Sequence, residues 1–450
     1  MNDAGRVPRH PLLEWAWDAL DSAALARAFT LAVFGAMASS FAIQRTASTV
    51  TYATIVVGLC IVGAAMLVRR RSELALVRLL PITLVLFFVW LAVTAVWSTG
   101  TVRTLLGWLI LAAPAFLAIV VGHMRDTLQT VRALGDTLRV LLSASLVLEI
   151  LSGVLLDLPI RFLGIQGNIA LGGPVQGIFG TRNMLGFVAV IALITFVIEW
   201  RTRSVPRGLA VFSVVLAGLL AVLSASPTVF VLALAAAAAT GALALVRHAP
   251  AVQRRTVQIG LLIIVVLGGL FAYAFRRGIV ALLNAGSDFA TRAELWDTLL
   301  IYVRFRPIQG WGWFGPWPTS EFPFASINII TNENHATALN AYFDVLLQTG
   351  WVGFLLFITV CALALFRAWL VASSRRSVLY AWTPLVLITL LVDSMFESFT
   401  LGGFGWLLLV ICVVRAGLTR SWRDGVRVPG SAGPAGGSPP LPQQSPGAPG

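Results

Sequence analysis

The sequence predicts an all-α polytopic membrane protein with about twelve transmembrane helices and a long, partly helical extracytoplasmic loop between spans 9 and 10. Hydrophobic residues make up 58% of the 450 residues, and charged residues only 11%. A soluble domain carries about 25% charged residues. Apolar runs of about 20 residues, the length that crosses a bilayer as a helix, recur along the chain. These observations exclude an ordinary soluble domain.

The predicted spans follow the apolar runs in chain order. They cover residues 23–43, 50–68, 79–97, 104–122, 138–156, 183–200, 208–224, 226–246, 257–275, 351–369, 378–393 and 399–416. The transmembrane domain is therefore residues 23–416, after a cytoplasmic or interfacial segment at 1–22. Apolar spacing within 11–29 predicts a helix lying at the membrane surface. The tail, 417–450, is rich in Pro, Gly and Ser and is predicted to be cytoplasmic and disordered.

The arginines predict the orientation. All 32 basic residues are arginines, and with a cytoplasmic N-terminus 23 of them fall in cytoplasmic segments. The positive-inside rule then places both termini in the cytoplasm, with the chain in the cytoplasmic (inner) membrane. The same rule accounts for the pI of 11.2 and makes nucleic-acid binding unnecessary. The outer arginines are Arg45, Arg103, Arg161, Arg182, Arg276, Arg277, Arg292, Arg304 and Arg306.

Two long outer connections, 157–182 and 276–350, hold seven of these nine arginines. Long loops escape the positive-inside bias, so one interpretation is that arginines are merely tolerated there. In GIFGTRNMLGF, however, Arg182 falls in the first turn of the sixth span, directly after Thr181. A guanidinium beside the free N–H groups of a helix start suits a phosphate or diphosphate.

A second arginine has a similar setting. In SDFATRAELWDTLL, Thr291 and Glu294 have the spacing of a capping box, which predicts Arg292 at the first helical position. The alternative is that Arg292 stacks on Trp296 or pairs with Asp288.

The run RFRPIQGWGWFG, residues 304–315, follows that helix. Arg304 and Arg306 are secondary candidates for the phosphates, or they complement the helix C-terminus. The glycines allow close backbone approach. Trp311 and Trp313 suit the wall of a glycan or lipid path, although interfacial anchoring alone also explains tryptophans.

The segment TNENHATALNAYFDVLLQTGWVG, residues 331–353, becomes an amphipathic helix from about Leu339. Asn340, Asp344 and Gln348 share its polar face. By the predicted topology His335 is the only outer histidine, and Glu333 is nearby. A lone loop histidine is more often structural than catalytic, so both interpretations stay open.

Four segments, GIFGTRNMLGF, RAELW, RPIQGWGWFG and NAYFDVLLQTGWVG, occur in that order around a long outer loop. Together they make the chain resemble the O-antigen ligase and Wzy-type polysaccharide polymerase family over residues 170–370. The resemblance implies a membrane glycosyltransferase that takes a glycan from a polyprenyl pyrophosphate carrier outside the cytoplasmic membrane. Ligases pass the glycan to a lipid-linked or other acceptor, and polymerases pass it to another repeat unit.

The resemblance also implies site residues. Arg182 and Arg292 correspond to the arginines that hold the lipid diphosphate, and His335 to the loop histidine tied to activity. The chain departs from the family pattern in one respect, because the residue directly before Asn340 is Leu339 where a histidine is common. His335 lies five residues before Asn340, so either it reaches the site from an extended segment or another group is the base.

The chemistry of glycan transfer indicates whether a metal, a cofactor and a base are needed. Arginines can stabilise the leaving diphosphate without a metal, and the outer loops hold no Asp-x-Asp motif. We therefore expect an inverting, metal-independent transfer without a cofactor. His335 is the first candidate for the base, followed by Glu333, Asp288 and Asp297.

Three further points bear on the function. Glu149, inside the fifth span, is a functional candidate unless it is neutral or paired with an arginine. Cys60, Cys361 and Cys412 lie in apolar runs and are interpreted as packing residues. The alternative function is a transporter or flippase, although we find no convincing internal repeat, and a third is a scaffold in envelope assembly.

Overall fold

The computed structural model describes residues 20–70, 81–250, 252–275, 278 and 286–418. Over these residues the regular structure is helical and contains no named strand, which confirms the all-α prediction. The predicted N-terminal segment and tail lie almost wholly outside the described residues. The predicted surface helix at 11–29 is described only from residue 20, and α2 begins at Ala23.

The helices follow one another closely. The first part contains α2 (Ala23–Ala38), α3 (Ser40–Thr46), α4 (Thr49–Arg69), α6 (Ile82–Val93), η1 (Thr94–Val96), α7 (Thr101–Met124) and α8 (Thr127–Ile150). The connection to α9 contains a π-helix, η2 (Leu151–Leu155), and three 3-10 turns, η3 (Arg161–Leu163), η4 (Asn168–Leu171) and η5 (Gly177–Phe179). The next helices are α9 (Arg182–Arg201), α10 (Arg207–Leu223), α11 (Pro227–His248) and α12 (Arg254–Ala274). The last are α14 (Gly286–Phe305), α15 (Phe324–Thr331), α16 (Ala341–Ser374), η6 (Val378–Ala381), α17 (Trp382–Asp393), η7 (Phe399–Leu401) and α18 (Gly403–Leu418).

Among the described residues, seven helices are long and apolar enough to cross a membrane, and an eighth span results if α2 and α3, bent by 72°, act as one. The other four predicted spans coincide with shorter apolar helices at Ile82–Val96, Arg207–Leu223, Val378–Asp393 and Gly403–Leu418. The protein is thus a multi-pass membrane protein. Twelve spans remain a prediction.

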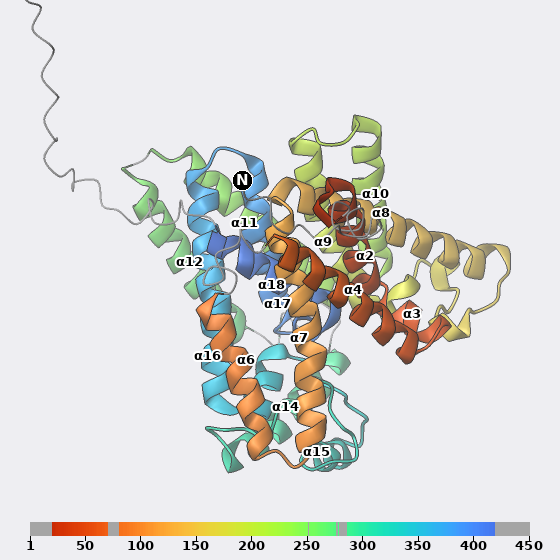
Figure 1. Ribbon diagram of the computed structural model, residues 1–450, viewed down its shortest axis with the longest axis vertical. Coiled ribbons are helices and arrows are strands. Elements are labelled where there is room, and N and C mark those ends of the chain that lie inside the picture. Colours follow the sequence, from red (N-terminus) through yellow and green to blue (C-terminus); the bar gives the residue numbers. More distant parts are fainter. Residues whose placement is uncertain (1–19, 71–80, 251, 276–277, 279–285, 419–450) are drawn as a thin grey trace, which may run out of the picture.

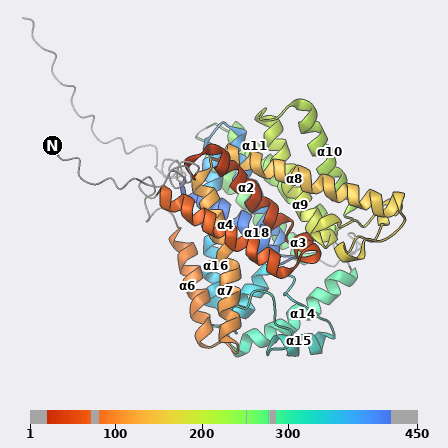
Figure 2. The same ribbon diagram turned by 45° about the vertical axis from the view of Figure 1, so that its right-hand side comes forward.

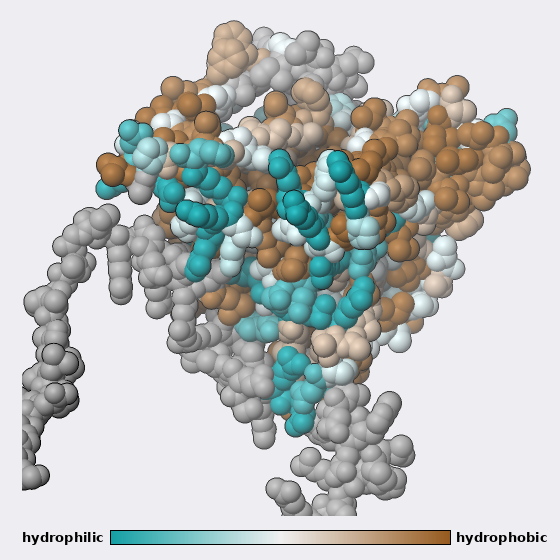
Figure 3. All heavy atoms as spheres, turned by 90° about the horizontal axis from the view of Figure 1, so that it is seen from above, coloured by the Kyte–Doolittle hydropathy of each residue, from teal (hydrophilic) through white to brown (hydrophobic). Residues whose placement is uncertain are grey.

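The helices differ in how deeply they lie in the bundle. In the most apolar part of α9, 72% of the residues are buried, and in α18 all of residues 404–414 are buried. The most apolar part of α12, in contrast, has no buried residue. Figures 1 and 2 show α14 and α15 together at one end, beside ends of α6 and α7. Seen from the opposite end, hydrophilic side chains gather across the middle and hydrophobic ones on the flanks (Figure 3). Apolar flanks are the surface expected to face lipid.

A glycine kink joins the outer loop to the bundle. Gly350 interrupts α16 with φ 66°, and a Cβ there would lie 2.2 Å from the Ile308 carbonyl oxygen. The Gly312 N–H donates to the Gln348 carbonyl at 2.8 Å, so the Gly–Trp run lies directly along this kink. The prediction that glycines permit close backbone approach is therefore confirmed.

Candidate functional site

Arg182 is the first residue of α9, and the predicted cap is present. The Thr181 hydroxyl accepts the Met184 N–H at 3.1 Å, as expected for an N-cap threonine. Arg182 is partly exposed. The structure thus places Arg182 in the first turn of a capped helix.

Glu149 explains why the chain before Arg182 takes its shape. Its side chain is 1% exposed, and Oε1 accepts the backbone N–H groups of Gln176 at 2.9 Å and of Gly177 at 2.8 Å. Gly177 has φ +53° and packs against Ser145, where a Cβ would lie 2.4 Å from the serine Cβ. Among the described residues, Glu149 is therefore bound to the backbone of the Arg182 loop and not to an arginine, which was one interpretation of the sequence.

Arg292 does not begin a helix, and the predicted capping box at Thr291 is wrong. Helix α14 starts at Gly286, which puts Arg292 in its second turn. The sequence pattern misled because a Thr-x-x-Glu spacing also occurs inside helices, where no free N–H group needs a cap. Arg292 therefore acts through its side chain and not through a helix terminus.

The Arg292 side chain is 13% exposed and is bound on three sides. Nη1 donates to the Leu339 carbonyl at 3.1 Å and to the Phe396 carbonyl. Nη2 lies 2.9 Å from Glu397 Oε1, an ion pair with a carboxylate that is 7% exposed. Arg292 therefore joins α14 to the start of α16 and to the segment after α17.

Glu397 also connects Arg292 to the start of α9. Asn183, the residue after Arg182, donates its Nδ2 to Glu397 Oε1 at 2.6 Å. The Asn183 carbonyl oxygen in turn accepts the Ser226 hydroxyl at 2.8 Å. The structure thus brings the helix start of Arg182 and the side chain of Arg292 to one carboxylate. We call Arg292, Glu397, Asn183 and Asp393 the arginine–carboxylate cluster.

Asp393 is the least satisfied member of this cluster. It is the last residue of α17 and 1% exposed, and neither carboxylate oxygen has a hydrogen-bond partner among the described residues. The Glu397 N–H donates to the Asp393 backbone carbonyl at 2.8 Å, so the two residues lie one turn apart. Buried polar atoms are usually hydrogen-bonded, so the oxygens of Asp393, unpaired in the described part of the chain, are an exception that needs a physical reason.

The two secondary candidates for the phosphates, Arg304 and Arg306, lie at and just after the end of α14. Arg304 is exposed in the last turn of α14. Arg306 Nη1 donates to the Trp97 carbonyl at 3.0 Å, and its guanidinium lies 4.4 Å from the Trp311 ring centre. Arg306 thereby connects the outer loop to Trp97, the residue directly after η1.

The predicted path tryptophans are buried. Trp311 is 6% exposed and its Nε1 donates to the Tyr302 carbonyl at 3.1 Å. Trp313 is 1% exposed, and its backbone N–H donates to the Thr94 hydroxyl at 3.0 Å. Their rings pack inside the protein, so neither contributes an open wall in this structure.

His335 is held in a short loop after α15. Its backbone N–H donates to Asn328 Oδ1 at 3.0 Å, and its carbonyl accepts Asn328 Nδ2 at 3.2 Å. Nε2 lies 3.4 Å from Glu333 Oε2, and Glu333 is half-exposed. Burial lowers the pKa of the His335 imidazole, and the Glu333 carboxylate partly offsets this. The charged neighbour of the His335 side chain is thus Glu333.

The polar face of the amphipathic helix is turned inward. Asn340 caps this helix and donates Nδ2 to the Met395 carbonyl at 2.9 Å. Asp344 accepts the Trp317 indole N–H at 2.6 Å and the Ala338 N–H at 3.0 Å, and it also bonds the Ser398 hydroxyl. These side chains hold the outer loop against the segment that carries Glu397.

Sequence reasoning did not find Glu397, Asp393 or Asn183. Asp393 and Glu397 lie in DSMFES, between two apolar runs, and their four-residue spacing was the available signal. Among the described residues, no group of three or more His, Cys, Asp or Glu side chains could hold a metal. Metal independence remains a prediction about the reaction.

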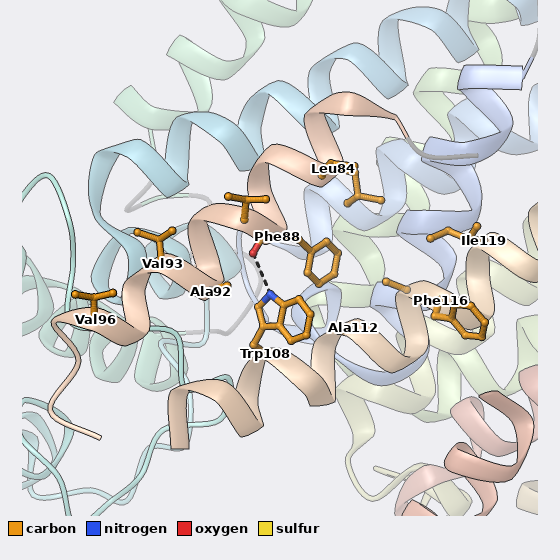
Figure 4. Close-up of a pocket in the computed structure, with 12 residues that line it drawn as sticks. Leu84, Phe88, Ala92, Val93, Val96, Trp108, Ala112, Phe116 and Ile119 are labelled. Carbon is orange, nitrogen blue, oxygen red and sulfur yellow. Dashed lines mark hydrogen bonds between the residues drawn. The ribbon is translucent and has the colours of Figure 1, made fainter. Parts of the chain in front are cut away.

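An apolar groove lies away from the cluster, between α6 and α7 (Figure 4). It has a volume of about 630 Å³, and its lining includes Leu84, Phe88, Trp108 and Phe116. The indole N–H of Trp108 donates to the Phe88 carbonyl at 2.9 Å. The groove offers apolar contact and no ionisable group, so it supplies none of the chemistry of transfer.

One comparison with protein families found a match, and it includes the outer loop. Residues 212–358 match the family model for O-antigen ligases. The O-antigen ligase match includes α14, the Gly–Trp run, His335 and the Gly350 kink, and it ends inside α16. Arg182, Asp393 and Glu397 lie outside the matched stretch. No curated protein matches the chain.

The match covers 147 of the 450 residues, about a third of the chain, and shows a similarity to O-antigen ligases over that stretch. The matched residues lie within the region 170–370 singled out by the sequence motifs. The match therefore supports the resemblance inferred from those motifs.

Proposed function

We propose that this protein transfers a glycan from a polyprenyl pyrophosphate carrier to an acceptor hydroxyl on the outer face of the cytoplasmic membrane. The observation that carries the proposal is the arginine–carboxylate cluster, in which Arg292 and the α9 start that bears Arg182 meet beside the matched outer loop. Both termini are proposed to be cytoplasmic, which follows from the arginine distribution.

The proposed reaction is an inverting displacement without a metal. The acceptor oxygen forms a bond to the anomeric carbon while the bond from that carbon to the phosphate oxygen breaks. Negative charge develops on the leaving diphosphate, and Arg292 and Arg182 would stabilise it there. Arg304 and Arg306 are secondary candidates for the same phosphates.

The acceptor hydroxyl must lose a proton. His335, predicted as the base with Glu333 behind it, has a lowered pKa and is therefore neutral and able to accept a proton at neutral pH. The other candidates are the carboxylate of Glu397, which pairs with Arg292, and that of Asp393, four residues before it.

The test uses purified protein in detergent micelles, which do not separate two compartments and therefore show no transport. Polyprenyl pyrophosphate-linked glycan is supplied with a panel of lipid-linked and glycan acceptors, in the presence of a chelator. The proposal expects glycan on an acceptor together with an equal amount of released polyprenyl pyrophosphate. A transporter or flippase would leave the donor intact in micelles, and that result would refute the proposed function.

A further inference from the structure

The following inference rests on the proposed function. That function requires Arg292 to bind a diphosphate, but in the arginine–carboxylate cluster Arg292 is already paired with Glu397. Arg292 is already bound to Glu397 and to two backbone carbonyls. A diphosphate approaching Arg292 has to take the place of Glu397, because both are anions that need the same guanidinium. Donor binding therefore changes the partners of Glu397.

The surroundings of Glu397 determine how readily its carboxylate binds a proton once Arg292 has moved to the diphosphate. Oε1 would keep the Asn183 amide, which is held in place because its carbonyl oxygen accepts the Ser226 hydroxyl. The side chain is only 7% exposed, so little water would replace the lost cation. A buried carboxylate without its cation binds a proton more readily.

Asp393 further increases the tendency of the Glu397 carboxylate to bind a proton. It lies one helical turn from Glu397, 1% exposed, and both its oxygens lack a hydrogen-bond partner among the described residues. Two neighbouring buried carboxylates disfavour each other's charge, so the pair takes up a proton more readily than either alone. The unsatisfied oxygens of Asp393 are explained if this pair shares a proton during the reaction.

We infer that Glu397, with Asp393 behind it, accepts the proton of the acceptor hydroxyl, and that the lipid diphosphate activates Glu397 by drawing Arg292 away. The hydroxyl oxygen bonds to the anomeric carbon, its proton passes to the Glu397 carboxylate, and the diphosphate leaves with the electron pair of the broken C–O bond. Arg292, now on the diphosphate, stabilises that leaving group.

The position before Asn340 supports this assignment for the present chain. Leu339 stands there, with φ 50°, and its carbonyl accepts Arg292 Nη1. A residue without a proton-accepting side chain thus occupies the point where the outer loop meets Arg292. His335 lies four residues earlier and is held by Asn328 and Glu333.

The experiment measures binding and transfer separately in the purified full-length protein. The binding probe is polyprenyl pyrophosphate without a sugar, and transfer uses the glycan-linked donor. Glu397→Gln keeps the shape but weakens competition for Arg292. We expect it to bind the probe about tenfold more tightly, and to lose transfer by about 100-fold or more, the usual share of a general base.

Three further variants sharpen the result. Glu397→Asp keeps a carboxylate and should restore part of the transfer. Glu321→Gln is the matched control, because it alters another outer Arg–Glu pair, in which Arg103 lies 2.9 Å from Glu321, and it should change neither measurement. His335→Ala should lower transfer by less than about tenfold.

The inference is overturned if Glu397→Gln transfers glycan near the wild-type rate. It is also overturned if that variant loses probe binding together with transfer, since this would indicate a role in holding Arg292 only. If instead the wild-type protein binds the probe but transfers no glycan, the proposed function itself fails. The two failures are therefore distinguishable.

Discussion

Replacing Glu149 should show how a buried carboxylate supports Arg182 from a distance. Oε1 accepts the N–H groups of Gln176 and Gly177 at 2.9 and 2.8 Å. In Glu149→Ala both donors, the buried Gly177 N–H and the partly buried Gln176 N–H, lose their acceptor, and each unsatisfied group costs about 1 to 3 kcal/mol. We expect a loss of about 2 to 6 kcal/mol in the free energy of unfolding.

Glu149→Gln separates the hydrogen bonds from the charge. Its amide oxygen can accept both N–H groups, so the loss should be about 1 kcal/mol, the extra strength of a charge-assisted bond. Thermal unfolding in one detergent, with the transfer rate measured below the transition, compares the two variants. Glu294→Ala, at an exposed position on α14, is the control. Equal stability of Glu149→Ala and Glu149→Gln would refute the reasoning.

Three other predictions follow from single features. Gly350→Ala should lower the unfolding temperature, because φ is 66° and the Cβ would lie 2.2 Å from a carbonyl oxygen, while Gly268→Ala in an open helical position should not. Arg139→Ala should cost about 3 to 5 kcal/mol, since it leaves the buried Glu199 carboxylate without its cation; similar thermal unfolding of this variant and wild type would contradict that. If His335 is the base instead of Glu397, its lowered pKa predicts that transfer persists at pH 6.5 and falls only at lower pH, as the imidazole becomes protonated; a pH–rate profile in which His335→Ala keeps the same acid limb would exclude it.

Local sequence signals predicted much of the fold. Long apolar runs predicted the helices because a spanning helix must satisfy its own backbone hydrogen bonds. The Thr181 cap and the glycine contacts of the Gly–Trp run were also predictable, since each depends on neighbouring residues or on a backbone that only glycine allows. The number of spans was not settled by length alone, because four apolar helices are short.

The cluster around Arg292 could not be predicted from the sequence. Arg292 and Glu397 are 105 residues apart, and Asn183 and Glu397 are 214 apart. Contacts of this kind depend on how α9, α14 and α17 pack, and no local periodicity reports on it. The capping-box prediction failed for a related reason, since the helix start at Gly286 depends on residues before the motif.

Arg292 and Arg182 are proposed to hold the diphosphate of a lipid-linked glycan donor during transfer. The most direct measurement is the rate of glycan transfer by purified Arg292→Ala and Arg182→Ala, compared with Arg103→Ala as an outer-face arginine control. We expect Arg292→Ala and Arg182→Ala to stay folded in the membrane and to lose transfer by about 100-fold or more, while Arg103→Ala keeps it. Near-normal transfer by both Arg292→Ala and Arg182→Ala would contradict this role of the two arginines.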